Sequence, residues 1–253
     1  MEVTLSLFII SFFLILSSFL NVVAIRIPKG ESISFPPSHC VKCSHRLRPL
    51  DLIPIASYVL LKGKCRYCKS PISIIYPLGE ILTTSLLLFT YFQTGLSKEL
   101  YVALPLVALL CTITISDLLY QIIPNKVNLF FFLYFSLLHF YYAPLPYTDY
   151  LLGILAGGGL LLLIALVSRG GMGGGDIKLM AVVGMAIGWK LTLLSFFIAS
   201  LIGGIVGFIL LVTKKVKRKD PIPFGPFLAL GTLIAYFWGV ELIQAYLFFI
   251  LGY

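Results

Sequence analysis

The chain has 253 residues, of which 59% are hydrophobic and only 11% are charged, and its mean hydropathy is +1.02. Soluble domains carry about 25% charged residues, so this composition excludes a soluble globular protein. The net charge of +9 does not indicate nucleic-acid binding, because the basic residues form no groove-like or aromatic-interleaved pattern. In membrane proteins, basic residues gather in cytoplasmic loops and meet anionic headgroups. We therefore expect an all-α polytopic membrane protein whose partners include membrane lipids.

Apolar segments of membrane-spanning length recur along the whole chain. The first does not resemble a cleaved signal sequence, because Glu2 precedes it instead of a basic region and no Ala-x-Ala site follows. The sixth is the weakest, and we expect it either to form a short helix or to fuse with the seventh into a broken hairpin. In all, we predict about eight transmembrane helices, over residues 3–25, 78–94, 100–117, 127–143, 150–168, 177–189, 191–212 and 224–251.

Four cysteines form two pairs in the polar segment after the first span. Cys40-x-x-Cys43 and Cys65-x-x-Cys68 are separated by 21 residues, a spacing close to that of four-cysteine zinc modules. Such a closed site stabilises a loop that lacks a core of its own and has no open position for catalysis. We predict structural zinc, with a redox role or a metal-free loop as the alternatives. The resulting division is a first transmembrane helix (1–29), a zinc-binding loop (30–76) and a membrane core (77–253).

The distribution of basic residues predicts the orientation of the spans. If the N-terminus lies outside, all Lys and Arg residues except Lys98 and Lys190 fall on one side of the membrane. The positive-inside rule then places the cysteine loop in the cytoplasm.

Two aspartates lie at the ends of apolar segments, where a carboxylate costs several kcal/mol unless it is paired, protonated or facing water. Asp117 ends the third span, and Asp176 starts the sixth after a glycine-rich run that includes Gly173, Gly174 and Gly175. Two spans intervene, so both carboxylates return to the same, cytoplasmic boundary. Two neighbouring carboxylates can share a proton, take a second proton from water and direct the hydroxide at an amide carbonyl.

Other readings of the aspartates remain open from the residues alone. Each aspartate can cap a helix or mark the lipid boundary. The pair can also carry protons in a secondary transporter whose broken helix is the glycine run. A third alternative is a non-enzymatic membrane scaffold whose zinc loop docks a partner.

The motifs resemble, in order and over nearly the full length, those of the bacterial type IV prepilin peptidases, which also serve type II secretion and competence pseudopili. The similar segments are Ser18-Phe19-Leu20-Asn21-Val22-Val23 with Arg26-Ile27-Pro28, the two cysteine pairs around Leu50-Asp51-Leu52-Ile53-Pro54, Tyr76-Pro77-Leu78-Gly79-Glu80, Asp117 with Ile123-Pro124-Asn125, Gly171-Met172-Gly173-Gly174-Gly175-Asp176-Ile177-Lys178-Leu179, and Pro223-Phe224-Gly225-Pro226-Phe227.

This resemblance implies an aspartic protease of the bacterial inner membrane with Asp117 and Asp176 as its catalytic pair. Its active-site loop would contain Gly173, Gly174, Gly175 and Lys178. The family cleaves the short basic leader from prepilins or pseudopilins after a glycine, on the cytoplasmic side. Many members then methylate the new N-terminus with S-adenosylmethionine, an activity associated with the cysteine loop and with acidic positions such as Glu80.

Overall fold

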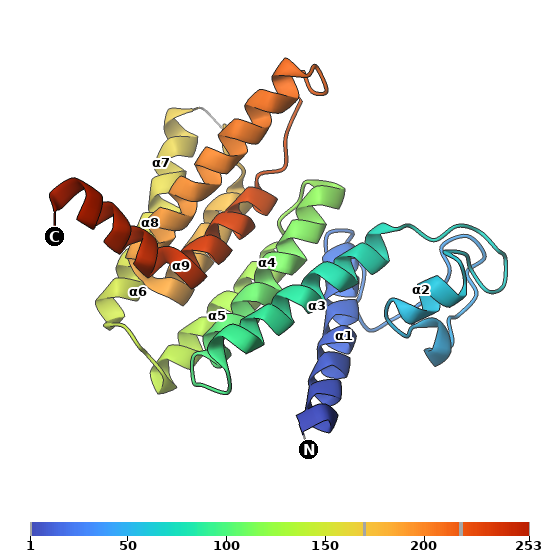
Figure 1. The fold of residues 1–253 in the computed structure, drawn as a ribbon. Helices are drawn as coiled ribbons and strands as arrows, with labels where there is room; N and C mark the ends of the chain where they lie inside the picture. The colour runs from blue at the N-terminus through green and yellow to red at the C-terminus, as the bar shows by residue number, and fades with distance from the viewer. Residues whose placement is uncertain (1, 169–170, 218–219, 253) are drawn as a thin grey trace. The chain divides into compact units, whose positions relative to one another are not determined.

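The computed structural model describes residues 2–168, 171–217 and 220–252, and within these ranges every regular element is a helix (Figure 1). The chain divides into an N-terminal unit, Met1–Ile115, and a C-terminal unit, Ser116–Tyr253. Helix α4 (Leu100–Tyr120) contains the boundary between them. Three of the basic residues counted for the orientation lie outside the described residues: Arg169, Arg218 and Lys219.

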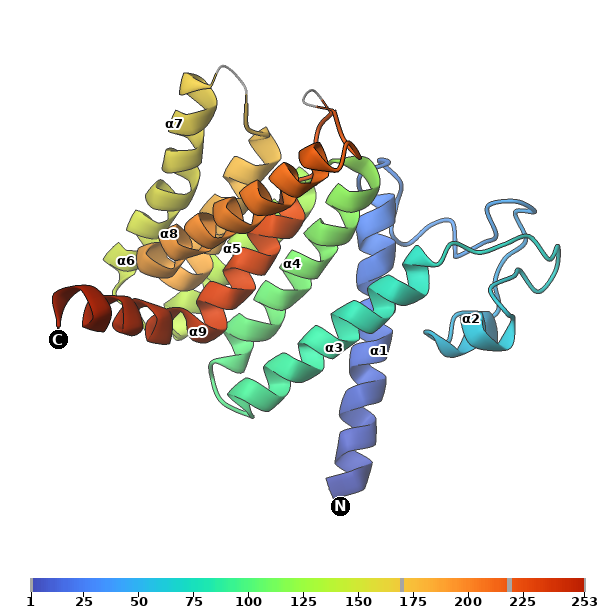
Figure 2. The same cartoon turned by 45° about the horizontal axis from the view of Figure 1, so that its top comes forward.

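In the N-terminal unit, the long helices α1 (Glu2–Arg26) and α3 (Ile75–Thr94) cross in both views (Figures 1 and 2). Small and polar side chains make this contact, as is common between membrane helices. Thr84 donates a 2.9 Å hydrogen bond to the Ser17 hydroxyl, and the Asn21 amide donates one of 2.9 Å to the Tyr76 carbonyl. At Gly79, a Cβ would lie 2.5 Å from the Asn21 side-chain oxygen. A branched residue at 79 would therefore force these helices apart.

The cysteine loop joins these two helices and has little regular structure. It holds a short 3-10 helix, η1 (Pro49–Asp51), and one helix of five residues, α2 (Ala56–Leu60). Between residues 30 and 74, Cys65 is the only hydrophobic residue that is buried. The loop therefore has no hydrophobic core of its own.

The C-terminal unit is a bundle in which α8 is the central helix. Its elements after α4 are α5 (Asn125–Tyr141), α6 (Tyr147–Ile154), the π-helical segment η2 (Leu155–Gly159), α7 (Leu160–Val167), α8 (Gly174–Val212) and α9 (Gly225–Leu251). Helices α6 and α8 approach so closely that a Cβ on Gly153 or Gly184 would collide with the facing backbone. Glycine at both positions permits this packing.

Helix α8 is broken at Gly188, whose φ of 75° and ψ of 173° are not helical. A left-handed φ is accessible to glycine at little cost. The two halves therefore meet at a kink at this residue. The predicted sixth and seventh spans are thus one interrupted helix, the fused alternative that the sequence left open. The first half, residues 174–187, is only about 21 Å long, which explains its weak hydropathy signal.

Six helices of the described chain are long and apolar enough to cross a membrane, and they cover Thr4–Arg26, Ile75–Thr94, Leu100–Tyr120, Tyr147–Val167, Gly174–Val212 and Gly225–Ile250. Helix α5 has 17 residues, slightly below a full span. If α5 and the two halves of α8 are counted separately, the helices correspond to the predicted set of about eight.

Candidate active site and metal centre

Asp117 lies in the last turn of α4, and its side chain is only 6% exposed. Its carboxylate accepts a 2.8 Å hydrogen bond from the backbone N–H of Gly225, at the start of α9. The first N–H groups of a helix have no partner within the helix and favour negative charge. A Cβ on Gly225 would lie 2.7 Å from the Asp117 carboxylate oxygen, so glycine permits this approach. Gly225 belongs to a motif noted in the sequence, but its contact with Asp117 was not foreseen.

Asp176 lies in the first turn of α8 and is 9% exposed. The N-cap of this helix is Gly173, three residues earlier. Asp176 therefore does not occupy the N-cap position, which was one alternative role for it. Its carboxylate turns back toward Gly173, where a Cβ would lie 2.9 Å from the carboxylate oxygen. By contrast, a Cβ on Gly174 would meet nothing within 4 Å. The glycine run therefore leaves open space beside a buried carboxylate.

The two carboxylates belong to the same unit and lie close enough to interact electrostatically. Among the described residues, neither has an ion-pair partner. Two buried like charges without a neutralising cation do not ionise together easily, and they behave as a coupled pair. The arrangement is thus suited to holding one proton between two acids.

A short turn after α4 brings the chain to the glycine run. The Ser116 hydroxyl donates a 2.6 Å hydrogen bond to the Ile122 carbonyl, and Gln121 has a positive φ of 53°. This turn sets Ile123 against the first turn of α8, where a Cβ on Gly175 would lie 2.7 Å from the Ile123 Cβ. Close packing at Gly175 therefore couples the segment after Asp117 to the segment that carries Asp176.

Lys178 points to the start of α5. Its ammonium group donates a 2.8 Å hydrogen bond to the side-chain oxygen of Asn125. This contact joins α8 to α5 beside the glycine run. Asn125 belongs to the motif Ile123-Pro124-Asn125, but the sequence does not predict its hydrogen bond with Lys178.

The four cysteines of the loop form one cluster, in which all sulfur atoms lie within 4.8 Å of one another. Cys40 and Cys68 are 3.8 Å apart, close to the roughly 3.8 Å edge of a tetrahedron with 2.3 Å zinc–sulfur bonds. The two pairs have the same backbone geometry: the N–H of Ser44 bonds to the Cys40 carbonyl, and that of Lys69 bonds to the Cys65 carbonyl. The cluster can therefore bind a metal ion.

The pKa values of the Cys40 and Cys43 thiols are shifted in opposite directions. Backbone N–H groups of Cys43 and Lys42 lower the pKa of Cys40 to about 6. At Cys43 the backbone of His45 acts in the same direction, but desolvation and the thiols of Cys68 and Cys40 raise its pKa to about 11. The thiol of Cys43 thus keeps its proton more readily than that of Cys40, and a bound cation would favour the thiolate form of both.

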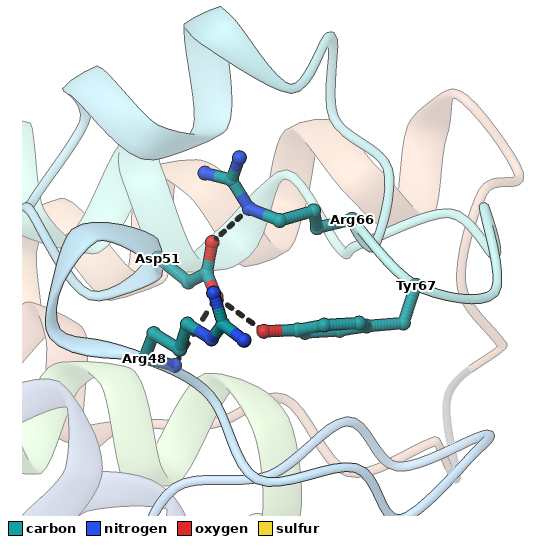
Figure 3. Close-up of polar contacts among 4 residues, drawn as sticks. All are labelled: Arg48, Asp51, Arg66 and Tyr67. Atoms are coloured by element: carbon teal, nitrogen blue, oxygen red, sulfur yellow. Dashed lines mark hydrogen bonds and ion pairs between the residues drawn. The ribbon is translucent and has the colours of Figure 1, made fainter.

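A buried carboxylate organises the rest of the loop (Figure 3). Asp51 contacts the Arg66 guanidinium at 2.6 Å and accepts hydrogen bonds from the Arg48 backbone and the Tyr67 hydroxyl at 3.1 and 3.4 Å. Burial alone would raise the pKa of Asp51, but these contacts, with Arg66 foremost, lower it. Asp51 therefore stays ionised, and its charge is neutralised within the loop.

Glu80, at the start of α3, contacts the other end of the loop. Its carboxylate accepts a 2.8 Å hydrogen bond from the backbone N–H of Ile55, a residue with φ of 60°. Positive φ is strained for a β-branched residue, so this bond stabilises an unfavourable turn. Glu80 also lines a cavity of about 450 Å³ within the N-terminal unit, together with residues that include Asn21, Arg26, Tyr58 and Tyr76.

Comparisons with known proteins match both halves of the chain to families. Residues 12–94 match the bacterial peptidase A24 N-terminal domain, and residues 104–208 match the type IV leader peptidase family. A prepilin leader peptidase/N-methyltransferase of Bacillus subtilis is 39% identical over 95% of this chain and 97% of its own length. Proteins of the same name from Xanthomonas campestris and Pseudomonas aeruginosa are 34% and 32% identical, each over 93% of this chain and 92% and 91% of their own lengths. No solved structure matches the chain.

Proposed function

Because the chain belongs to the type IV leader peptidase family, we propose that it cleaves the basic leader from prepilins or pseudopilins with Asp117 and Asp176 as the catalytic pair. The observation that carries this proposal is the pair of buried, unneutralised carboxylates in one unit. One is held by the first N–H group of α9, and the other lies beside an open glycine run.

Hydrolysis by such a pair consumes one water molecule. The ionised carboxylate takes a proton from water as the water oxygen attacks the carbonyl carbon of the scissile peptide bond. The carbon–nitrogen bond then breaks, and the protonated acid gives its proton to the leaving nitrogen. The open space at Gly174, next to the Asp176 carboxylate that lies against Gly173, lets an extended substrate backbone approach this carboxylate.

The direct test is cleavage of a synthetic prepilin by the purified protein in liposomes. We expect mass spectrometry to find a mature chain that begins at the residue after the glycine ending the leader. An intact prepilin after prolonged incubation with folded protein would refute the proposal.

Replacement of Gly225 by alanine is expected to slow cleavage by about 10- to 100-fold. The new Cβ would push the Asp117 carboxylate away and break its hydrogen bond to the α9 backbone, a charge-assisted contact of about 1.5–3 kcal/mol. The rate is measured with the synthetic prepilin. Gly204→Ala is the matched control, because a Cβ there meets nothing within 4 Å. Equal rates for both variants would contradict the role given to Gly225.

The chain is a multi-pass membrane protein of the inner membrane, as its apolar helices and family indicate. We further propose that its N-terminus lies outside and that the cysteine loop and both aspartates face the cytoplasm. The charge bias supports this orientation. In the proposed division of labour, residues 1–29 anchor the zinc loop of residues 30–76, and residues 77–253 form the protease core.

Cysteine labelling in intact cells tests this orientation. Ser97→Cys in the α3–α4 loop is expected to react with a membrane-impermeant maleimide, because the loop would lie outside. Lys215→Cys, after α8, is expected to react only once the cells are opened. Both positions are exposed, and the unaltered chain provides the background labelling. The reverse pattern would invert the topology.

The metal of the four-cysteine cluster is proposed to be zinc in a structural role. Four thiolates and no open position are typical of structural zinc. The lack of buried hydrophobic residues other than Cys65 in the loop supports the same role, since the metal would supply the missing core.

The second proposed activity is methylation of the new N-terminus with S-adenosylmethionine, which supplies an electrophilic methyl group when bound. The cavity of the N-terminal unit fits such a molecule, because its 450 Å³ lie within the usual range for small ligands. Its lining offers the Tyr58 ring for stacking and the charges of Arg26 and Glu80 for the carboxylate and the cationic groups of the ligand. The Glu80 bond to Ile55 holds one wall of this cavity in place.

Glu80→Gln is expected to weaken S-adenosylmethionine binding by at least about tenfold, because it removes one charge-assisted contact. The glutamine oxygen can still accept the Ile55 N–H, so the loop keeps its position. Isothermal titration calorimetry with the ligand alone measures the effect. Glu31→Gln makes the same change at an exposed loop position. Unchanged affinity in the Glu80→Gln variant would show that this cavity does not bind S-adenosylmethionine through Glu80.

A further inference from the structure

His139, near the end of α5, is 1% exposed, and both of its ring nitrogens contact backbone carbonyls. Nδ1 lies 3.1 Å from the Tyr142 oxygen, and Nε2 lies 2.9 Å from the Met185 oxygen in α8. Carbonyl oxygens only accept hydrogen bonds, and a neutral imidazole has one N–H to donate. Only the doubly protonated ring satisfies both contacts. A neutral ring would leave a lone pair facing a carbonyl inside the protein.

The Met185 carbonyl needs a partner because of the break in α8. A helical hydrogen bond from the N–H of residue 189 to this oxygen requires helical backbone angles at residues 186–188. Gly188 has φ of 75° and ψ of 173°, so that bond is not made. Nε2 of His139 supplies the missing donor. The broken end of the first half-helix also carries the negative pole of its dipole, which favours a cation.

The remaining surroundings fit a cationic ring. Tyr150, itself 2% exposed, stacks on His139 with ring centroids 3.9 Å apart and planes inclined by 21°. An aromatic face attracts a cation at this distance. Tyr147 fastens the same corner by donating a 3.0 Å hydrogen bond to the His139 carbonyl.

Two charged residues flank the break itself. The Cβ and the backbone oxygen of Asp149 in α6 would each lie 3.7 Å from a Cβ on Gly188. The ammonium of Lys190 lies over the Trp189 ring, 5.7 Å from the centroid.

We infer that His139, as an imidazolium, is a positioning residue that caps the break in α8 and thereby holds the half-helix bearing Asp176. The half-helix of residues 174–187 is anchored at its far end by this contact and at its near end by the packing at Gly175 and by Lys178. The consequence for catalysis rests on the proposed function, whereas the protonation state does not.

The first measurement is the nitrogen NMR spectrum of histidine-labelled protein, compared with that of His139→Gln to identify the His139 signal. We expect two protonated ring nitrogens at neutral pH. A signal of neutral imidazole wherever the protein stays folded would overturn the inference. This result is independent of any peptidase activity, so a protein that cleaves no prepilin would refute the proposed function without affecting this test.

The second measurement records the fluorescence of Trp189 beside the break in α8 and the rate of prepilin cleavage in the same variants. The chain has two tryptophans, so Trp238→Phe leaves Trp189 as a single reporter next to Gly188. In this background, His139→Gln is expected to shift the Trp189 emission, because the break in α8 loses its cap, and to cleave prepilin about tenfold more slowly.

Tyr147→Phe is the matched control for loosening of the same corner. It removes the bond to the His139 carbonyl but keeps both ring contacts, so the Trp189 emission and the cleavage rate are expected to stay close to those of the Trp238→Phe protein. A His139→Gln protein with the same emission and rate as the Trp238→Phe protein would show that His139 does not position the half-helix.

Discussion

Replacing Asp117 or Asp176 by asparagine is expected to lower the rate of prepilin cleavage by at least about a thousandfold. Each change removes one of the two groups that exchange protons with water and the leaving nitrogen, while side-chain size is kept. The fold is expected to survive, because asparagine at 117 can still accept the Gly225 N–H and neither native carboxylate has an ion-pair partner among the described residues. Single-turnover cleavage of the synthetic prepilin measures the effect.

The double variant separates a coupled pair from two independent contributions. If both carboxylates act on one proton, Asp117→Asn with Asp176→Asn is expected to be no slower than either single variant, since residues that act as a unit are not additive. Asp220→Asn is the control, because it makes the same change at an exposed position of the same unit. Cleavage by either single variant at a rate near that of the unaltered chain would exclude the pair as the catalytic centre.

Counting helices was enough to predict that the two aspartates come together. Because two spans separate the third from the sixth, parity predicts that Asp117 and Asp176 return to the same boundary, which stays a prediction, and the structure places both residues in one unit. The cysteine cluster was predictable for a similar reason. Its spacing restricts the chain to a few closed geometries, and the four sulfurs do converge.

Contacts between segments far apart in the sequence could not be predicted in this way. The Gly225 N–H reaches Asp117 across 108 positions of the chain, and Lys178 reaches Asn125 across 53. Each of these residues lies in a motif that was noted, yet a motif does not name its partner. The role of His139 depends on a carbonyl freed by the break at Gly188, and hydropathy carries no signal of a backbone dihedral angle.

Removal of the metal is expected to unfold the cysteine loop while the dyad-bearing unit stays folded. Structural zinc contributes about 10–16 kcal/mol to small modules, and Cys65 is the only buried hydrophobic residue between residues 30 and 74. The Asp51–Arg66 contact cannot replace it, because the Arg66 side chain is 47% exposed and exposed ion pairs contribute about 1 kcal/mol or less. Limited proteolysis and metal analysis of Cys65→Ser report the loss.

The unaltered chain is expected to hold one zinc ion and Cys65→Ser none, with new cleavage sites for trypsin confined to the loop. The cavity proposed for the methyl donor loses a wall in this variant, since Cys65, Tyr58 and Arg66 all line it. S-adenosylmethionine affinity is therefore expected to fall with the zinc content, while prepilin cleavage falls far less than in the aspartate variants. Cys111→Ser is the control, because this buried cysteine lies outside the cluster. A Cys65→Ser protein that keeps one tightly bound zinc would show that the four thiolates do not form the site.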